Sequence, residues 1–580
     1  MRITVAKTAG FCMGVRRALD LVFDAARARS RDAANAAPLS TLGHLIHNHQ
    51  ALEALEARGV KIAKDISEVE GGTVVIRAHG AGPSLRAAID VRGLDVIDAT
   101  CPRVVRCQRT AERAASAGRQ VLIAGDADHA EVEALVDFAG GRAQVVSSVD
   151  EARELKLSSP VTLLAQTTFN SRTFAEIAEV VRGRMGAGEG GGDVEVVNSL
   201  CRSTEDRQAE IAELAAGVDA VIVVGGLHSA NTRRLAEVAR SLGRPTFHVE
   251  TADDLDPADF AGVSSVGVTA GASTPAWITE RVVERLSGMR SPARRVARRI
   301  LEALAGSNLL LAGGAASVTC AASLATKTQP RADVLFMAFA YVFWAYAANR
   351  AGDDARAPAS TSGRASFFLR HSRGLLLAAG GLALGALGLA FAAGPLPGGV
   401  LAGATALAGL YSLRVLPARI RPRDIPGSKD VMIALAWAFV AVGLPLMSAP
   451  GGGGPGLAHA LVAAGVFVLS FSASTALALG DVQSDRLIGH ESVAMLLGTS
   501  RARALAAAGA AVVMLVAGGL TAAGLLPAAG AGLAVSGALV LVVTLRPRQT
   551  GDALVVEVTI QTALLAAGPV ALAAAHIAAH

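Results

Sequence analysis

Short apolar runs alternate with helical stretches through the first half of the chain, and each run ends in a small or polar turn. The run 121–124, for example, is followed by a Gly-Asp turn and then by a helical pattern over 130–138. Strands that alternate with helices predict parallel α/β units, and the spacing of the runs predicts that several units repeat. Ligands of such sheets bind beyond the carboxyl ends of the strands, where helices begin. The predicted strands lie at 73–78, 121–124, 161–165, 220–224 and 265–269.

The second half is instead built from long apolar stretches, and about 20 such residues cross a bilayer. Arginines gather in alternate loops, such as 350–373 and 414–430, whereas the loops near 394 and 450–456 carry no charge. This distribution predicts an all-α polytopic membrane domain with its basic loops in the cytosol. Buried helices of a large soluble protein are the alternative. About nine spans are predicted, at 307–325, 333–349, 374–393, 397–413, 431–449, 457–479, 504–525, 527–545 and 553–577.

Composition separates the same two halves. A quarter of residues 1–299 are charged, as in ordinary soluble proteins, against a tenth of residues 300–580. The basic excess lies between apolar spans, so the net charge of +5 indicates a membrane surface and no nucleic-acid partner. The contrast excludes a wholly soluble, a disordered and a collagen-like chain.

Residues 1–9 predict a strand and not a signal peptide, and five cysteines are too few for a disulfide framework. We therefore expect a cytoplasmic N-terminal half and a multi-pass C-terminal half in the cell inner membrane. The predicted domains are an α/β domain over 1–287 and a membrane domain over 306–580. A basic linker over 288–305 would lie on the lipid surface between them.

Three of the five cysteines lie in turns, outside the periodic apolar runs. Cys12, Cys101 and Cys201 are spaced so that each could belong to a different repeated unit. Three thiolates on an iron–sulfur cluster leave one iron open to a substrate. A lone cysteine is more often a small core residue, and that is the interpretation for Cys107 and Cys320.

Polar residues at the other turns favour an anionic ligand. Histidines at strand–helix transitions can donate to anions, and Glu131 at a helix start is a candidate proton donor. A lone histidine is usually structural, so the argument depends on several such turns together. Hydroxyl and amide groups with helix N-termini form a phosphate cradle. The candidates are His44, His79, His129, Thr167, Thr168, Ser229, Asn231 and Ser273.

These residues belong to motifs whose order along residues 1–285 resembles the 4-hydroxy-3-methylbut-2-enyl diphosphate reductases (the IspH/LytB family), which catalyse the last step of the non-mevalonate isoprenoid pathway. The motifs are Gly-Phe-Cys-x-Gly-Val-x-Arg-Ala at 10–18, His-x-x-His-Asn at 44–48, Ala-His-Gly at 78–80, Asp-Ala-Thr-Cys-Pro at 98–102, His-x-Glu-Val-Glu at 129–133, Gln-Thr-Thr at 166–168, Arg-Gln at 207–208, Ser-x-Asn at 229–231 and Thr-Ala-Gly-Ala-Ser at 269–273.

The resemblance implies three α/β units around a central 4Fe-4S cluster held by Cys12, Cys101 and Cys201. It implies that Glu131 relays protons and that Thr168 or Thr167 lies near the leaving hydroxyl. Ferredoxin or flavodoxin would supply electrons, and the products would be isopentenyl and dimethylallyl diphosphate. The diphosphate would be held by His44, His79, His129, Ser229, Asn231 and Ser273.

Two acidic clusters follow predicted spans in the second half. Carboxylates at span ends can hold Mg²⁺ on a diphosphate, although solvated loops that anchor helix ends are the alternative. Asp481 and Asp485 are four residues apart and would share a helix face. The other cluster contains Asn349 and Asp353.

Residues 300–580 resemble the UbiA-type membrane prenyltransferases, which have about nine helices and two Asp-rich motifs. The second motif fits, whereas the first has Arg350 and Ala357 at positions where the family usually has Asp. We therefore expect a reductase fused to a prenyltransferase that uses Mg²⁺, a prenyl diphosphate and an unknown acceptor in the lipid bilayer. The alternatives are a tethered reductase with a catalytically dead C-terminal half, and a prenyltransferase with a redox-sensing Fe–S head.

Overall fold

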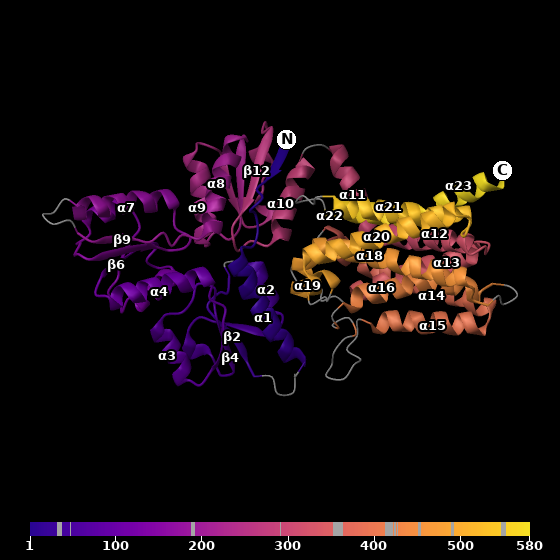
Figure 1. Ribbon diagram of the computed structural model, residues 1–580, viewed down its shortest axis with the longest axis horizontal. Helices are drawn as coiled ribbons and strands as arrows, with labels where there is room; N and C mark the ends of the chain where they lie inside the picture. The colour runs from indigo at the N-terminus through magenta and orange to yellow at the C-terminus, as the bar shows by residue number, and fades with distance from the viewer. Residues whose placement is uncertain are drawn as a thin grey trace. The chain divides into compact units, whose positions relative to one another are not determined.

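The computed structural model describes residues 1–31, 37–46, 48–186, 192–289, 292–351, 363–411, 422, 425, 427–449, 454–488, 492–546 and 553–580. The chain forms two compact units, Met1–Arg290 and Ser291–His580. Figure 1 shows strands and helices in the first unit and helices in the second. Each unit is described by itself.

In the described part of the first unit, twelve strands form three four-stranded sheets, and all the pairs are parallel. One sheet has the order β1 (Arg2–Val5), β12 (Ser265–Ala270), β10 (Ala220–Val224), β11 (Thr246–Val249). A second has the order β3 (Val60–Ala63), β2 (Leu39–Leu42), β4 (Thr73–Ile76), β5 (Asp95–Asp98). The third has the order β7 (Gln144–Val146), β6 (Gln120–Ala124), β8 (Val161–Ala165), β9 (Val194–Val196).

The three sheets repeat one plan. In each, two buried central strands are flanked by shorter or more exposed outer strands. The first sheet is assembled from both ends of the unit, because β1 pairs with β12 in the register Arg2↔Ser265 to Val5↔Val268. The predicted α/β class is therefore confirmed. The five predicted apolar runs correspond to β4, β6, β8, β10 and β12.

Helices follow the strands, as parallel pairing requires. Pro83 and Pro102 occupy the first turns of α3 and α4, where a missing N–H costs no hydrogen bond. The helices are α1 (Met13–Arg31), α2 (His49–Glu56), α3 (Pro83–Val91), α4 (Pro102–Ser116), α5 (Ala130–Phe138), α6 (Val149–Glu154), α7 (Ser171–Gly186), α8 (Arg202–Ala216), α9 (Ala230–Ser241) and α10 (Ala276–Met289).

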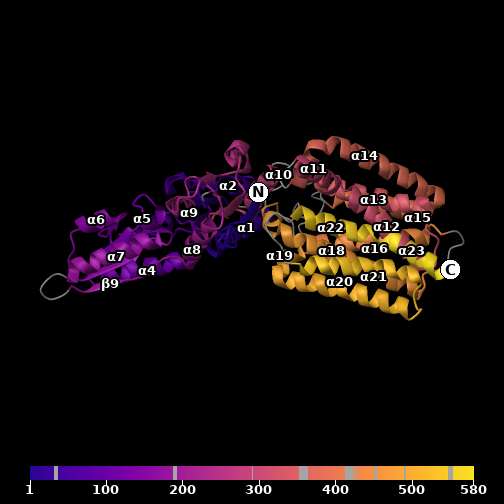
Figure 2. The same ribbon diagram turned by 90° about the horizontal axis from the view of Figure 1, so that it is seen from above.

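The described part of the second unit is helical. Its long helices run roughly side by side in both views (Figures 1 and 2). They are α11 (Pro292–Gly306), α12 (Leu309–Ala325), α13 (Ala332–Ala351), α14 (Gly363–Ala393), α15 (Pro395–Leu410), α16 (Ser428–Ala438), α17 (Leu444–Met447), α18 (Leu457–Ile488), α19 (Val493–Leu497), α20 (Thr499–Ala522), α21 (Ala531–Leu545), α22 (Ala553–Leu565) and α23 (Ala567–Ala579).

Seven helices or helix pairs in the described residues are long and apolar enough to cross a membrane, which fits a multi-pass membrane protein. The count becomes eight if α11 and α12, which meet at a bend of 59°, form one span. The predicted number of about nine is thus slightly too high. The remaining predicted span, 397–413, corresponds to α15, whose 16 residues make it shorter than the others.

Small residues bring the helices of this unit close together. A Cβ at Gly532 on α21 would lie 2.2 Å from the carbonyl oxygen of Ala567, so only glycine permits this approach. The hydroxyl of Ser317 on α12 donates to the carbonyl of Leu565 and accepts from the N–H of Gly568, at 2.5 and 2.7 Å. Such contacts are typical of helices packed within a bilayer.

Candidate functional site

Three cysteines occupy equivalent places in the three sheet units. Each follows an outer strand, β1, β5 or β9, and stands at the start of a helix. Cys101 is the N-cap of α4 and Cys201 the N-cap of α8. Cys12 directly precedes α1, and the N–H of Val15 lies 3.5 Å from its sulfur. A helix N-terminus presents backbone N–H groups and the positive end of the helix dipole, so all three cysteines stand where a negatively charged group such as a metal–thiolate centre is stabilised.

The three sulfurs lie near one another. A Cβ at Gly14 would lie 2.8 Å from Sγ of Cys101 and 3.9 Å from Sγ of Cys12. Cys12 and Cys201 both act electrostatically on the thiol of Cys101. Among the described residues no three His, Cys, Asp or Glu side chains are close enough to hold a single ion. Sulfurs from three separate turns are donors that suit an iron–sulfur cluster, because separate iron atoms of a cluster bind separate thiolates.

The other two cysteines are core residues, as predicted. Cys107 and Cys320 are 2% and 6% exposed. Burial raises the pKa of Cys107 to about 12, so this residue remains a thiol. Its S–H lies 3.3 Å from the carbonyl of Arg103. Burial also raises the pKa of Cys101, which means that its ionisation needs a positive partner such as iron.

The candidate anion ligands lie at the carboxyl ends of the central strands. His44 and His79 follow the neighbouring strands β2 and β4. His129 follows β6, and its ring packs edge-on against the ring of His79 with centroids 5.1 Å apart. The Nδ1 atom of His129 accepts from the N–H of Glu131 at 3.2 Å, which leaves Nε2 to carry the proton. His44 is exposed.

Ser229, Asn231 and Ser273 follow the neighbouring central strands β10 and β12. Ser229 caps α9 by accepting from the N–H of Thr232 at 3.4 Å. Asn231 and Ser273 are 6% and 7% exposed, yet among the described residues neither polar atom of the Asn231 amide nor the Ser273 hydroxyl has a hydrogen-bond partner. Buried polar groups are normally paired. Three unpaired atoms at two adjacent turns therefore indicate a polar ligand.

Glu131 lies between the β6 and β8 turns and is 1% exposed. Its carboxylate accepts from the backbone N–H and the hydroxyl of Thr167, at 2.7 and 2.8 Å. Burial raises the pKa of Glu131 to about 7, because these two hydrogen bonds only partly offset desolvation. The group is therefore poised to release a proton near neutral pH.

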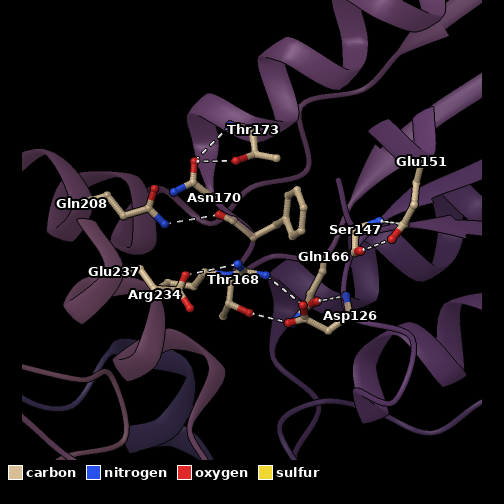
Figure 3. A network of polar contacts seen from close by, with 11 residues as sticks. Asp126, Ser147, Glu151, Gln166, Thr168, Asn170, Thr173, Gln208, Arg234 and Glu237 are labelled. Atoms are coloured by element: carbon tan, nitrogen blue, oxygen red, sulfur yellow. Dashed lines mark hydrogen bonds and ion pairs between the residues drawn. The ribbon is translucent and has the colours of Figure 1, made fainter. Parts of the chain in front are cut away.

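Thr168 is held by a different network, which Figure 3 shows. Its hydroxyl accepts from the side-chain amide of Gln166 at 2.9 Å, and the Gln166 oxygen accepts from the N–H of Asp126 at 2.9 Å. The Asp126 carboxylate in turn pairs with Arg234 at 2.8 Å, and that guanidinium lies over the Phe169 ring. Gln166 belonged to a predicted motif but had no predicted role. Its structural role is to fix the orientation of Thr168.

The structure describes only some of the residues predicted for a site in the second unit. Asn349 and Arg350 lie in the last turn of α13, and Arg350 donates to the carbonyl of Gly306 at 3.0 Å. Asp353 lies outside the described residues. Asp481 and Asp485 lie in the last turns of α18, and the description of that segment covers its backbone only.

One carboxylate in this unit was not predicted. Asp430 on α16 is fully buried. It accepts from the Ser474 hydroxyl at 2.5 Å and from the N–H of Val493 at 2.8 Å. Ser474 and Val493 lie on either side of Asp481 and Asp485 along the chain. Asp430 therefore fixes both ends of the segment that carries the second acidic motif.

The first unit is thus an α/β protein of three similar sheets, with one cysteine per sheet and polar turns at the central strands. Residues 3–287 match the family described as LytB protein, and the chain belongs to that family. Residues beyond this half lie outside the match.

Curated relatives cover the same half. The "4-hydroxy-3-methylbut-2-enyl diphosphate reductase" of Pelobacter propionicus is 42% identical over 286 residues, which are 49% of this chain and 98% of the relative. The protein of the same name from Solidesulfovibrio magneticus is 44% identical over 289 residues, 49% of this chain and 99% of the relative.

Two solved structures each cover about half of this chain. The E-1-hydroxy-2-methyl-but-2-enyl-4-diphosphate reductase of Plasmodium falciparum is 25% identical, with a TM-score of 0.46, over 50% of this chain and 88% of that chain. A UbiA homolog from Aeropyrum pernix K1 is 18% identical, with a TM-score of 0.34, over 47% of this chain and 98% of that chain.

Proposed function

We propose that residues 1–287 reduce 4-hydroxy-3-methylbut-2-enyl diphosphate. Two electrons and two protons remove the allylic hydroxyl as water and give isopentenyl or dimethylallyl diphosphate. The observation that carries this proposal is the meeting of three cysteines at three helix N-termini, in a chain that covers 98% of a reductase at 42% identity. The polar turns nearby supply the donors that a diphosphate needs.

Cys12, Cys101 and Cys201 would hold a 4Fe-4S cluster. When bound, the cluster supplies single-electron transfer and an open iron for the substrate oxygen. Gly14 supports this role, because any larger residue would place a carbon between two of the sulfurs. An external one-electron carrier such as ferredoxin or flavodoxin would provide the electrons.

The diphosphate would be held at the ends of the central strands. Asn231 and Ser273 have buried polar atoms without partners, and a charged phosphate oxygen would satisfy their donors. His129 presents its Nε2–H because Nδ1 already accepts from the backbone. The full proposed set is His44, His79, His129, Ser229, Asn231 and Ser273.

Glu131 would deliver a proton toward the leaving hydroxyl. Its burial keeps the carboxyl protonated up to about pH 7, which a general acid at neutral pH requires. Thr167 contacts Glu131 directly and would continue the proton path. Thr168, fixed by Gln166, would bind the substrate hydroxyl.

We further propose that residues 306–580 act as a membrane prenyltransferase, joined to the reductase by the basic segment 288–305. Asn349, Asp353, Asp481 and Asp485 would bind Mg²⁺ and a prenyl diphosphate. The hydrogen bonds that the buried Asp430 accepts from Ser474 and Val493 support this proposal, because a solvated loop that only anchors a helix end would not need to be fixed in this way. The protein would lie in the cell inner membrane with its reductase half in the cytoplasm and would transfer the prenyl group to a lipid-soluble acceptor.

Both activities can be tested together. Membranes that contain the full-length protein would be incubated anaerobically with labelled 4-hydroxy-3-methylbut-2-enyl diphosphate and a strong reductant. The water-soluble and lipid-soluble label would then be separated. We expect labelled five-carbon diphosphates from the wild type and none from Cys101→Ser.

The second activity is measured with a labelled longer prenyl diphosphate and Mg²⁺, so that no elongation is needed. Lipid-soluble label should exceed that of Asp481→Ala. Equal label would identify a tethered reductase with an inactive membrane half. No reduction by a protein that holds its cluster would refute the reductase and favour a redox-sensing head.

A further inference from the structure

Arg207 on α8 is a buried cation near Cys12 and Cys201, and both terminal nitrogens of its guanidinium donate hydrogen bonds to backbone carbonyls. The residue is 4% exposed. Its Nη2 donates to the carbonyl of Gly10 at 2.7 Å, and its Nη1 donates to the carbonyl of Ala270 at 3.1 Å. Gly10 lies two residues before Cys12, and Ala270 ends β12.

No carboxylate of the described residues lies within 4.0 Å of this guanidinium. Glu210 is the carboxylate that acts electrostatically on Arg207, but it already accepts from the backbone N–H groups of Lys7 and Thr8 at 2.5 and 2.9 Å. Burial lowers the pKa of Arg207, and the groups that oppose this shift are Cys12, Glu210 and Cys201 in that order. Two of these three groups are cysteines of the candidate cluster site.

A buried charge without an ion-pair partner is costly. Arginine nevertheless keeps its charge in proteins, because its intrinsic pKa is very high. The cost falls if negative charge arrives nearby after folding. Thiolates that carry a cluster would bring that charge to the side of Arg207 where Cys12 and Cys201 lie.

We propose that Arg207 is a positioning residue that supplies the fixed counter-charge of the cluster and thereby raises its reduction potential. The inference rests on the proposed function, since it requires that the three cysteines hold the cluster. Reduction adds one negative charge, and a cation in a site of low dielectric stabilises the reduced state more than the oxidised state. The two carbonyl contacts prevent the guanidinium from turning away toward water.

The test is a redox titration, followed by electron paramagnetic resonance, of the reconstituted full-length protein. Arg207→Lys keeps the charge and loses one carbonyl contact, whereas Arg207→Gln keeps a donor and loses the charge. Arg184 is the control, because it also donates to two carbonyls, those of Ala152 and Leu155, but is exposed. Arg184→Gln removes its charge in the same way.

We expect Arg207→Gln to lower the ratio of reduced to oxidised cluster about tenfold at a fixed ambient potential. For a one-electron couple this corresponds to a reduction potential that is about 59 mV lower. Arg207→Lys should shift it much less, and Arg184→Gln should not shift it. Equal potentials for wild type and Arg207→Gln would overturn the proposal, as would equal shifts for Lys and Gln. If Arg207→Gln fails to hold its cluster, the reduction potential of Arg207→Lys becomes the test. A potential near that of the wild type supports the proposal, and a tenfold change in the ratio of reduced to oxidised cluster overturns it. A wild type that binds no cluster would refute the proposed function itself.

Discussion

Glu131 gives the clearest quantitative prediction, because its burial determines when it can donate a proton. The carboxyl is 1% exposed, and its pKa is about 7. At pH 8 about one molecule in eleven would carry the proton, and each further pH unit would lower that fraction about tenfold. If the protonated carboxyl is the donor, turnover should fall by the same factor above pH 7.

The same pKa makes a prediction for stability, with a definite sign. The carboxyl has a pKa of 4.5 when unfolded and about 7 when folded. Between these values the folded state binds the extra proton, so stability is highest at acidic pH and falls as pH rises to about 7. The full loss is about 3 kcal/mol.

Both predictions are tested with Glu131→Gln, which keeps the shape of the side chain and can still form a hydrogen bond with Thr167. We expect turnover to fall by about 10² to 10⁴ and to lose its pH dependence near 7. The variant should also lack the loss of thermal stability between pH 5 and 8. The control is Glu133→Gln, which removes the same charge from an exposed position on the same helix.

Turnover would be measured from pH 6 to 9 with a reduced viologen, whose potential does not change with pH. The stability measurement uses thermal unfolding of the same full-length preparations. An unchanged pH profile in Glu131→Gln would refute the assignment of this carboxyl as the proton donor. A variant as sensitive to pH in its unfolding as the wild type would show that the raised pKa belongs to another group.

Three further predictions concern the cluster and the diphosphate. Gly14→Ala should lose most of its iron, because the new Cβ would lie 2.8 Å from Sγ of Cys101. Gly183→Ala is the control and should keep its iron, because no described atom lies within 4 Å of the new Cβ. Iron content and visible absorption distinguish the two variants. Cys107→Ala should retain both the cluster spectrum and turnover, since this thiol is a core group, and loss of iron would contradict that role. Ser273→Ala should raise KM about tenfold or more with little change in kcat, as expected for one hydrogen bond to a charged ligand; steady-state kinetics at saturating reductant would show whether kcat falls instead.

The sequence located the strands that lie inside the sheets better than those at the edges. The five predicted runs are central strands that are buried along almost their whole length. The outer strand β5 reads Asp-Val-Ile-Asp and is largely exposed, so it gives no apolar run. Because each cysteine follows an outer strand, the sequence could give the spacing of Cys12, Cys101 and Cys201 but not their position in the sheets.

The functional residues that could not be predicted from the sequence make contacts with residues far away along the chain. Asp430 bonds to Ser474 and Val493, which lie 44 and 63 residues further along the chain, and no local pattern reveals such a pairing. Arg207 had been noted as part of a motif, but its burial against Gly10 could not be seen without the pairing of β1 with β12. Chain topology, which depends on distant contacts, accounts for both omissions.

The pairing of β1 with β12 also determines when, during synthesis of the chain, the first sheet can form. Arg2 finds its partner Ser265 only when 263 later residues have left the ribosome. At about 5–20 residues per second this takes roughly 13–50 s, during which Cys12 has no completed sheet beside it. If the three cysteines hold the proposed cluster, its assembly would therefore follow synthesis of the whole α/β half. The first helix of the second unit begins at Pro292, only 27 residues after Ser265, so synthesis of the helical half begins almost as soon as the first sheet can close.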